Sequence, residues 1–469
     1  VLVEGATDAT LLGRSCATLL AQSHTDWRLS LPGAARTAAD WARAQNDPRI
    51  AEAKAGMAAE GGFVMVLRAG DRLAPHALAA FLAAFAREPD RTIVYSDDAR
   101  FAPASVTAEP HFKPDWSPTR QAHAPYVGRA ALLRADVAAP LLQRAFPTPQ
   151  AMVDAALADA RASEVGHVAR VLVETIDAAE TPPREMRRVA AARRTSAKIT
   201  IIIPTRDKIR LLTRCLDSIF AKTSNRDYDV LVIDNGSVEP ATLARLEKYK
   251  REQPRFDVVA NPMPFNFSAL CNFGAARANG DTLVFLNNDT VVLQPRWLEH
   301  MLEFATQPDI GAVGCKLLYP SGLVQHSGVV LGMGGVAGHF GEGIGRRARG
   351  WLGGSLAPHE ASAVTAACLM VERAKFEAVG GFDADNLPVD LNDVDLCLRL
   401  NARGWRTICD CRVMLAHHQS ASRGGSKLRL QRTYRGERKY FTEKWAAAIR
   451  NDPFFNPNLS LYDREPKLG

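Results

Sequence analysis

The stretch DTLVFLNNDTVV, residues 281–292, decides the fold of this chain, because it joins a short apolar run to a polar turn. Residues 283–286 are typical of a buried strand in a parallel sheet. Asn287, Asn288 and Asp289 follow at the carboxyl end of that expected strand, where open α/β sheets bind their ligands. A carboxylate beside an amide carbonyl offers the hard oxygen donors that suit Mg²⁺ or Mn²⁺ carrying a diphosphate. A plain polar turn is the alternative interpretation of these residues alone.

Two further strands are expected upstream of this stretch. Residues 199–206, ITIIIPTR, and residues 229–237, DVLVIDNGS, each combine an apolar run with a turn. Apolar residues recur at helical spacing over residues 211–220, between the two runs. This is the pattern of a βαβ unit, whose loops gather at one edge of a parallel sheet. Both turns are therefore expected to lie near the Asn-Asn-Asp turn.

Three more polar motifs lie within or beyond this region. Residues 264–268, PFNFS, lead into an expected helix that contains Asn272. Residues 389–399, VDLNDVDLCLR, place two aspartates two positions apart at the start of another expected helix. Residues 417–424, HHQSASRG, combine two histidines with an arginine and a glycine.

These motifs, in this order, resemble family-2 glycosyltransferases with the GT-A fold. More narrowly, they resemble the bacterial enzymes that build O-antigen, capsule or rhamnan polymers. The matching stretches cover nearly all of residues 198–462 and include IIIPTRD, VIDNGS, PFNFSALCNFGA, FLNNDT and HHQSASRG. The resemblance implies an α/β fold, a dTDP- or UDP-sugar donor with rhamnose as the expected sugar, and a glycan or lipid-linked glycan acceptor. It is specific for the family and says little about the sugar.

The chain is expected to contain two domains. Residues 181–197, rich in proline and arginine, are predicted to be a linker. Residues 1–180 resemble a second, eroded copy of the domain in residues 198–462. We therefore expect two tandem, Rossmann-like GT-A domains with mostly parallel sheets. The first is degenerate, and the second is catalytic and carries a C-terminal helical extension.

The first copy departs from the pattern where the chemistry would take place. Arg68 and Ala69 precede Asp71 where the resemblance predicts acidic residues, and an arginine repels a divalent cation. Residues 173–175, VET, stand where a histidine-bearing segment is expected. We predict that the first domain has lost donor binding. An active second transferase with unusual ligands is the alternative.

The resemblance also assigns roles in the cation site and in catalysis. Asp289 is the expected first ligand of Mn²⁺ or Mg²⁺. One of the pair His417 and His418 is expected to complete the site or to contact the diphosphate, since neutral imidazole is a common metal ligand. A carboxylate is the usual base for an attacking hydroxyl, and the resemblance selects Asp393. Asp395 is then expected to face the protein and orient its helix. A single base without a covalent nucleophile implies inversion at the anomeric carbon.

The donor nucleotide is expected to lie across the strand ends. Asp234 can accept hydrogen bonds from ribose hydroxyls or a base N–H. Arg423 can bind phosphate oxygens through its planar guanidinium. An ordinary turn is the alternative for residues 234–237, whose residue types all favour turns. The other donor contacts that the resemblance implies are Pro204, Thr205, Asp207, Asn266, Asn272 and Asn288.

Composition and charge agree with this interpretation. The 469 residues suffice for two or three domains, and no apolar run approaches the roughly 20 residues that span a membrane. The net charge of +7 is gathered in two clusters, near residues 346–349 and 423–439, without a nucleic-acid-binding signature. We therefore expect a diphosphate and an anionic membrane face as partners, and no nucleic acid. The sequence leaves the oligomeric state open.

Cysteine usage indicates the compartment. The eight cysteines include no CxxC pair, which fits a reducing cytoplasm. Cys409 and Cys411, two positions apart, have the right chemistry for a metal, but without a second pair they are expected to pack in the core. We expect a cytoplasmic protein with a peripheral contact to the inner face of the plasma membrane.

Two other protein classes compete with a transferase. A carbohydrate-binding or scaffold protein, with its second domain also inactive, would show no donor-dependent transfer. A sugar-nucleotide nucleotidyltransferase would also bind a nucleotide at strand ends. That class needs a glycine-rich first loop bearing a basic residue, and residues 204–207, PTRD, lack the glycines.

Overall fold

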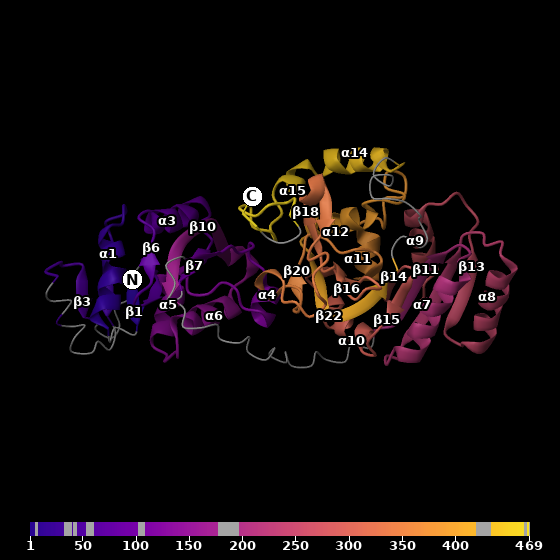
Figure 1. Ribbon diagram of the computed structural model, residues 1–469, viewed down its shortest axis with the longest axis horizontal. Helices are drawn as coiled ribbons and strands as arrows, with labels where there is room; N and C mark the ends of the chain where they lie inside the picture. The colour runs from indigo at the N-terminus through magenta and orange to yellow at the C-terminus, as the bar shows by residue number, and fades with distance from the viewer. Residues whose placement is uncertain are drawn as a thin grey trace. The chain divides into compact units, whose positions relative to one another are not determined.

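The computed structural model describes residues 1–4, 8–31, 40, 45–52, 61–101, 108–176, 197–418, 433–463 and 467–468. The chain forms two compact units (Figure 1). The first comprises Val1–Arg187 and Phe455–Leu459, and the second comprises Arg188–Phe454 and Ser460–Gly469. Helices pack on sheets in each unit, so the predicted α/β class is confirmed. The expected linker, apart from its last residue, lies outside the described residues.

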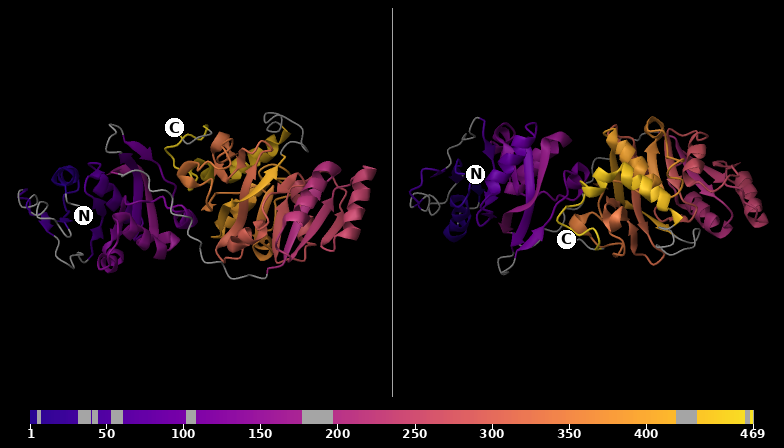
Figure 2. Two further views of the ribbon diagram at one scale, coloured as in Figure 1. Left: turned by 60° about the horizontal axis from the view of Figure 1, so that its bottom comes forward. Right: turned by 90° about the horizontal axis from the view of Figure 1, so that it is seen from above.

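The second unit begins with strands that alternate with helices. They are β11 (Ile199–Thr205), α7 (Ile209–Lys222), β12 (Tyr228–Asp234), α8 (Pro240–Glu252), β13 (Phe256–Ala260), α9 (Phe267–Ala275) and β14 (Thr282–Leu286). The strands are parallel in the order β13-β12-β11-β14. Every residue of β11 and β14 is buried, as a sheet covered on both faces requires. Figure 2 shows the helices beside these strands.

Beyond β14 the sheet becomes mixed. Its elements are β15 (Thr290–Val292), α10 (Trp297–Ala305), β16 (Ile310–Leu318), β17 (Val324–His326), β20 (His359–Glu360), β21 (Cys368–Glu372), α11 (Arg373–Ala378), α12 (Asn392–Ala402) and β22 (Arg406–His417). The order continues β14-β21-β16-β22-β15, and only β16 and β22 run parallel in this part. The antiparallel pairing of β15 with β22 sets Thr290 opposite His417. The end of β22 thereby lies beside the Asn-Asn-Asp turn.

Shorter elements complete the second unit. They are β18 (Val329–Leu331), the 3₁₀ turn η2 (Met333–Gly335), β19 (Ala337–His339), the 3₁₀ turn η3 (Trp351–Gly353), α14 (Arg435–Lys444) and α15 (Ala446–Arg450). Phe441 of α14 is fully buried and packs in the same apolar cluster as α9 and α12. Within the described ranges, no helix is both long enough and apolar enough to cross a membrane.

The first unit repeats the alternation on a smaller scale. Its elements are β1 (Leu2–Glu4), α1 (Ala9–Leu20), β2 (Leu29–Leu31), β3 (Ile50–Glu52), β4 (Phe63–Val64), β5 (Val66–Arg68), β6 (Arg72–Leu73), α3 (Ala77–Arg87), β7 (Ile93–Phe101), β8 (Glu109–His111), α4 (Pro118–His123), β9 (Ala131–Arg134), α5 (Ala135–Leu142), α6 (Pro149–Asp159), the 3₁₀ turn η1 (Ala162–Glu164) and β10 (Val165–Ile176).

Both units have the same strand topology. The order β3-β2-β1-β5 is parallel, as is β13-β12-β11-β14. The order β4-β9-β7-β10-β6 matches β14-β21-β16-β22-β15, with β7 and β10 parallel and the other neighbours antiparallel. The interrupted pair β4 and β5 thus occupies the place of β14. The two units therefore share one strand order, which agrees with the predicted tandem arrangement.

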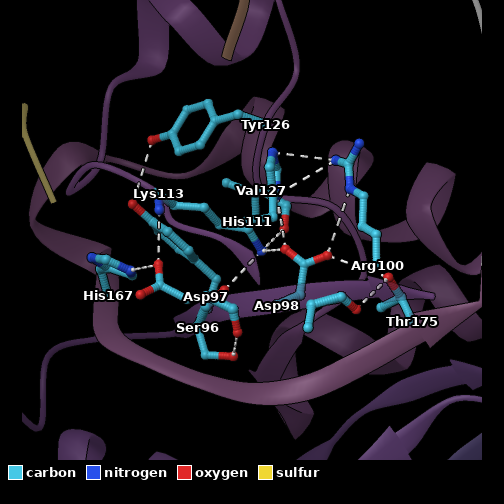
Figure 3. Close-up of polar contacts among 12 residues, drawn as sticks. Ser96, Asp97, Asp98, Arg100, His111, Lys113, Tyr126, Val127, His167 and Thr175 are labelled. Atoms are coloured by element: carbon cyan, nitrogen blue, oxygen red, sulfur yellow. Dashed lines mark hydrogen bonds and ion pairs between the residues drawn. The ribbon is translucent and has the colours of Figure 1, made fainter. Parts of the chain in front are cut away.

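A buried polar network fills the core of the first unit at β7 (Figure 3). Asp97 accepts hydrogen bonds from the backbone N–H of Lys113 at 2.8 Å and from Asn456 Nδ2 at 3.0 Å, and His167 Nε2 lies 3.0 Å from it. The buried ammonium of Lys113 lies 2.6 Å from Asp98. Each buried charge therefore has a partner, as burial requires. Because Asn456 belongs to the segment Phe455–Leu459, a segment far along the chain supplies part of this network.

Candidate active site

The carboxyl ends of β11, β12 and β14 meet at one edge of the sheet. The register pairs Pro204 with Ile233 and Thr205 with Asp234. The side-chain amide of Asn288 donates to Thr205 Oγ1 at 2.8 Å. This hydrogen bond joins the Asn-Asn-Asp turn to the end of the first strand, so the structure brings together the three turns that the sequence predicted to be neighbours.

Asp289 and His417 face each other at this edge. Their Oδ1 and Nε2 atoms are 3.1 Å apart, and both residues are buried. His417 Nδ1 lies 2.7 Å from the acceptor oxygen of Gln325, so in the neutral ring Nδ1 carries the proton and the lone pair of Nε2 is directed toward Asp289. Asn287 Nδ2, a donor, lies 3.3 Å from the same Nε2, which agrees with this tautomer.

This pair fits a cation. Two lone pairs face each other at hydrogen-bond distance, and a carboxylate oxygen and an imidazole nitrogen are both ligands for Mn²⁺. His417 makes with Gln325 the kind of contact that a metal-binding histidine usually makes with an outer acceptor. Sequence reasoning missed Gln325, because only the pairing of distant segments places it against His417.

The carboxylate of Asp393 lies close to the same turn. It accepts a hydrogen bond from the backbone N–H of Ala366 at 2.9 Å, and the next residue, Ala367, accepts one from the backbone N–H of Asn287 at 3.1 Å. Leu391, which precedes the helix that carries Asp393, has a φ of 59°. Left-handed backbone is unfavourable for leucine, and such strain is concentrated at functional sites.

Asp395 points away from this edge. It is fully buried and accepts hydrogen bonds from Arg399 Nε at 2.7 Å and Trp445 Nε1 at 2.9 Å, and the ammonium of Lys444 lies 2.8 Å away. The prediction that Asp395 faces the protein and orients its helix is confirmed. Of the two aspartates, only Asp393 is placed near the Asn-Asn-Asp turn.

The two aspartates of the donor prediction hold the loops together. Asp207 Oδ1 accepts hydrogen bonds from the backbone N–H groups of Val238 and Glu239, both at 2.9 Å. Asp234 accepts one from the backbone N–H of Ser237 at 3.1 Å. These contacts fix the loop after β11 against the loop after β12.

Asn266 and Asn272 tie helix α9 to a later segment. Asn266 caps the helix by accepting from the backbone N–H of Ala269 at 2.8 Å, and its amide donates to the carbonyl of Ala384 at 2.9 Å. Asn272 exchanges two hydrogen bonds, of 2.8 and 2.9 Å, with the backbone of Phe382. In the structure these polar groups serve the fold, and their contact with a donor stays a prediction.

The remaining predicted residues follow β22. The backbone N–H of His418 donates to the carbonyl of Asp289 at 3.0 Å, which fixes the end of β22 to the turn. Its ring is half-buried. Arg423 lies outside the described residues.

In the first unit, Asp71 takes the position of Asp289, directly before β6 as Asp289 directly precedes β15. Two guanidinium nitrogens of Arg129 bind its carboxylate at 2.7 Å, and the backbone N–H groups of Arg68 and Ile176 donate to it at 2.8 and 3.0 Å. The carboxylate is therefore neutralised from within the fold. The positive charge at this position comes from Arg129 and not, as the sequence suggested, from the exposed Arg68.

The register also identifies the first unit's counterpart of His417. Glu174 pairs with Arg72 across β10 and β6, as His417 pairs with Thr290 across β22 and β15. Glu174 and Arg72 form an ion pair in the structure. The first unit therefore has a glutamate at the position where the second has the imidazole that faces Asp289.

A second pair of histidines lies near His417. The Nδ1 atoms of His326 and His339 are 2.9 Å apart. Burial lowers the pKa of His326 well below its usual range, and the neighbouring His339, His359 and His417 lower it further. The ring of His326 is therefore neutral at neutral pH.

Comparison with known proteins supports a family assignment. Residues 200–347 match the family model described as Glycosyl transferase family 2. The O-antigen biosynthesis protein RfbC of Myxococcus xanthus is 34% identical over 98% of this chain, and the protein y4gI of Sinorhizobium fredii is 32% identical over 97%. These alignments cover 40% and 56% of the two relatives, so the chain spans about half of their length or less.

More distant likenesses cover about half of the chain. An N-acetylglucosaminyl-diphospho-decaprenol L-rhamnosyltransferase of Mycobacterium tuberculosis is 27% identical over 45% of this chain and 73% of its own length. The solved mannosyltransferase PcManGT of Pyrobaculum calidifontis, with GDP-Man and Mn²⁺, is 20% identical, with a TM-score of 0.41, over 58% of this chain and 70% of that one. GalNAc-T7, with UDP, GalNAc and Mn²⁺, is 13% identical, with a TM-score of 0.41, over 54% and 57%.

The buried neutral ring of His326 predicts a pH dependence. Below about pH 6.5 the unfolded chain binds a proton that the folded chain does not bind, so acid stabilises the unfolded state. The free energy of unfolding of the second unit should therefore decrease between neutral pH and about pH 5. In His326→Asn, the decrease in the free energy of unfolding between neutral pH and about pH 5 should be smaller by about 1 kcal/mol, as measured by urea unfolding. His300→Asn, on α10 and outside the group, is the control, and equal slopes in the His326 variant and the wild type would contradict the prediction.

Proposed function

We propose that residues 198–462, which include the stretch that matches the Glycosyl transferase family 2 model, move a sugar from a nucleoside-diphosphate sugar to a glycan or lipid-linked glycan, with inversion. The observation that carries the proposal is the Asp289–His417 pair, 3.1 Å apart at the carboxyl edge of the sheet, with Asp393 held close by. Rhamnose from a dTDP- or UDP-sugar is the proposed donor group. The support is the names of the O-antigen and rhamnosyltransferase relatives.

Asp289 and His417 are the proposed ligands of Mn²⁺ or Mg²⁺, with His418 next to them. Such a cation, when bound, stabilises the charge that develops on the leaving diphosphate. Gln325 keeps the proton on His417 Nδ1, so that Nε2 stays available as a ligand. Asn287 and Asn288 add neutral polar groups at the same turn and leave Asp289 as the anionic ligand.

Asp393 is the proposed base. The backbone N–H groups of Ala366 and Val394 hold its two carboxylate oxygens, each at 2.9 Å, and fix its orientation. As the acceptor hydroxyl attacks the anomeric carbon, its proton passes to Asp393 and the bond to the diphosphate breaks. Attack opposite the leaving group inverts the configuration of that carbon.

The donor is proposed to lie over the loops after β11 and β12. Asp234 would accept from the base or the ribose, and Thr205, Asp207 and Asn288 would line the same edge. Asn266, Asn272 and Pro204 would shape the pocket through the backbone that they fix. A phosphate contact from Arg423 and a peripheral contact with the inner face of the plasma membrane are further parts of the proposal.

The first unit is proposed to have lost donor binding. Its Asp71 is held by Arg129, and a guanidinium in that position excludes a second cation by like-charge repulsion. Glu174 stands where the second unit has His417. The unit would then keep the fold without the chemistry and leave a single donor site on the chain.

The proposed base can be tested with Asp393→Asn. The amide keeps an acceptor for the N–H of Ala366 but cannot take a proton, so turnover should fall roughly 10²- to 10⁴-fold. Donor affinity should stay near that of the wild type, because the donor does not need the base. Transfer from a panel of nucleotide sugars and calorimetric donor binding measure the two effects. Near-normal turnover would remove Asp393 from this role, and no transfer by the wild type from any donor would favour the scaffold alternative.

The cation ligand can be tested with Asp289→Ala. Binding of the nucleoside diphosphate in Mn²⁺ should weaken by at least the roughly 10- to 100-fold seen for lesser changes around metal sites. The loss in EDTA should be much smaller. Asp257→Ala, at an exposed aspartate on β13, is the control. Equal losses with and without the cation would make Asp289 structural, and full activity in EDTA would overturn the metal-dependent mechanism.

A matched pair of variants tests the single donor site. Calorimetric titration of the wild type with the cognate nucleoside diphosphate and Mn²⁺ should give a stoichiometry near one. His417→Ala should weaken this binding strongly, because it removes a proposed ligand. Glu174→Ala changes the equivalent position in the first unit and should leave binding unchanged. A stoichiometry near two, or a loss of sites in the Glu174 variant, would show that the first unit binds a donor.

A further inference from the structure

A buried group of sulfur and nitrogen ligands lies on β20 and β22. Cys409 and Cys411 come from β22, and His359 comes from β20, where it pairs opposite Cys409. One atom from each of the three side chains lies within 4.8 Å of the other two, and no residue of the group is more than 2% exposed. The expectation that both cysteines are buried is confirmed. The sequence did not indicate His359 as a neighbour of the two cysteines, because it lies far from them along the chain.

The two sulfur atoms have the spacing of a metal site. Cys409 Sγ and Cys411 Sγ are 3.8 Å apart. Two thiolates on a tetrahedral zinc ion, with Zn–S bonds of about 2.3 Å, are also about 3.8 Å apart. Residues two apart on a strand point to the same face, so the strand itself delivers both sulfurs to one side.

Both ring nitrogens of His359 face a carbonyl oxygen, whereas a neutral ring has only one N–H to donate. Its Nδ1 lies 3.0 Å from the carbonyl oxygen of Ala357, and its Nε2 lies 3.1 Å from that of Ser327. A neutral imidazole has a single N–H, so one ring nitrogen directs a lone pair at a carbonyl oxygen unless the ring is protonated or a cation lies there. Donation from Nδ1 to Ala357 is the usual outer contact of a metal-binding histidine. It leaves Nε2 and the Ser327 carbonyl as neighbouring ligands.

The charge of the group also suits a divalent cation. Two thiolates would neutralise a divalent ion, and a neutral centre avoids the high cost of a buried unpaired charge.

We propose that Cys409, Cys411 and His359 bind a structural Zn²⁺ ion, with the carbonyl oxygen of Ser327 as the fourth ligand. Zinc accepts this mixture of soft and borderline ligands and is usually tetrahedral in closed sites. The ion would join β20 and β22 to the turn between β17 and β18. This site is separate from the proposed donor cation at Asp289.

Metal analysis of the full chain tests the proposal. Protein made in zinc-containing medium should hold about one zinc per chain by mass spectrometry. The double variant Cys409→Ser/Cys411→Ser should hold none. Cys271→Ser, at an equally buried cysteine of α9, is the matched control and should keep the ion. Asp289→Ala should also keep it, which separates this site from the donor site.

A spectroscopic measurement protects the test against variants that fail to fold. Wild-type protein whose zinc is replaced by Co²⁺ should show the near-ultraviolet absorption of thiolate–cobalt charge transfer. His359→Gln keeps both thiols and should weaken cobalt binding roughly 10- to 100-fold or more. Wild-type protein without zinc and without this absorption would overturn the proposal. A Cys–His ion pair without metal, or a Cys409–Cys411 disulfide, would overturn it equally.

Discussion

The antiparallel pairing of β15 with the end of β22 is the constraint on which the candidate site depends. It places Thr290 opposite His417, so that Asp289, one residue earlier, meets the imidazole. A slip of one residue would turn His417 to the other face of the sheet, because side chains alternate along a strand. The backbone hydrogen bond from the N–H of His418 to the carbonyl of Asp289 also fixes this register.

The two units show what happens to the same scaffold without that pair. Both have one strand order, and both carry an aspartate at the end of the central strand. In the first unit Arg129 binds the aspartate through two nitrogens. An arginine side chain therefore supplies the positive charge that a metal ion would otherwise supply. Removing one partner of such a buried pair typically costs about 3–5 kcal/mol. The pair therefore makes this turn independent of any ion.

The sequence predicted the elements whose signal is local. The apolar runs of β11, β12 and β14 predicted the parallel part of the sheet. The turns that follow them predicted that Asp234 and Asp289 lie at its carboxyl edge. The spacing of Asp393 and Asp395 predicted that the two side chains point apart, as they do, and the resemblance selected Asp393 as the one at the edge. The order of strands beyond β14 was not readable in this way, because antiparallel and parallel neighbours there come from distant segments.

The residues that reasoning from sequence missed all act through such distant pairings. Arg129 and His359 lie in no predicted motif, and Gln325 lies in a matching stretch that gave it no contact with His417. Each is defined only by the partner that the fold brings to it. Gln325 acts as a hydrogen-bond acceptor, Arg129 as a cation and His359 as a proposed ligand. A glutamine, arginine or histidine on the surface has the same chemical groups. Burial beside a fixed partner turns that common chemistry into a specific role.

One short segment connects several of these roles. Gln325 contacts His417, His326 contacts His339, and the carbonyl of Ser327 lies against His359. Alternation along β17 directs neighbouring side chains to opposite faces, so adjacent residues reach different histidines. A shift of this segment would then disturb the orientation of His417 and the ligands around His359 together. The rigidity of the proposed donor site therefore depends on how firmly the turn after β17 is held.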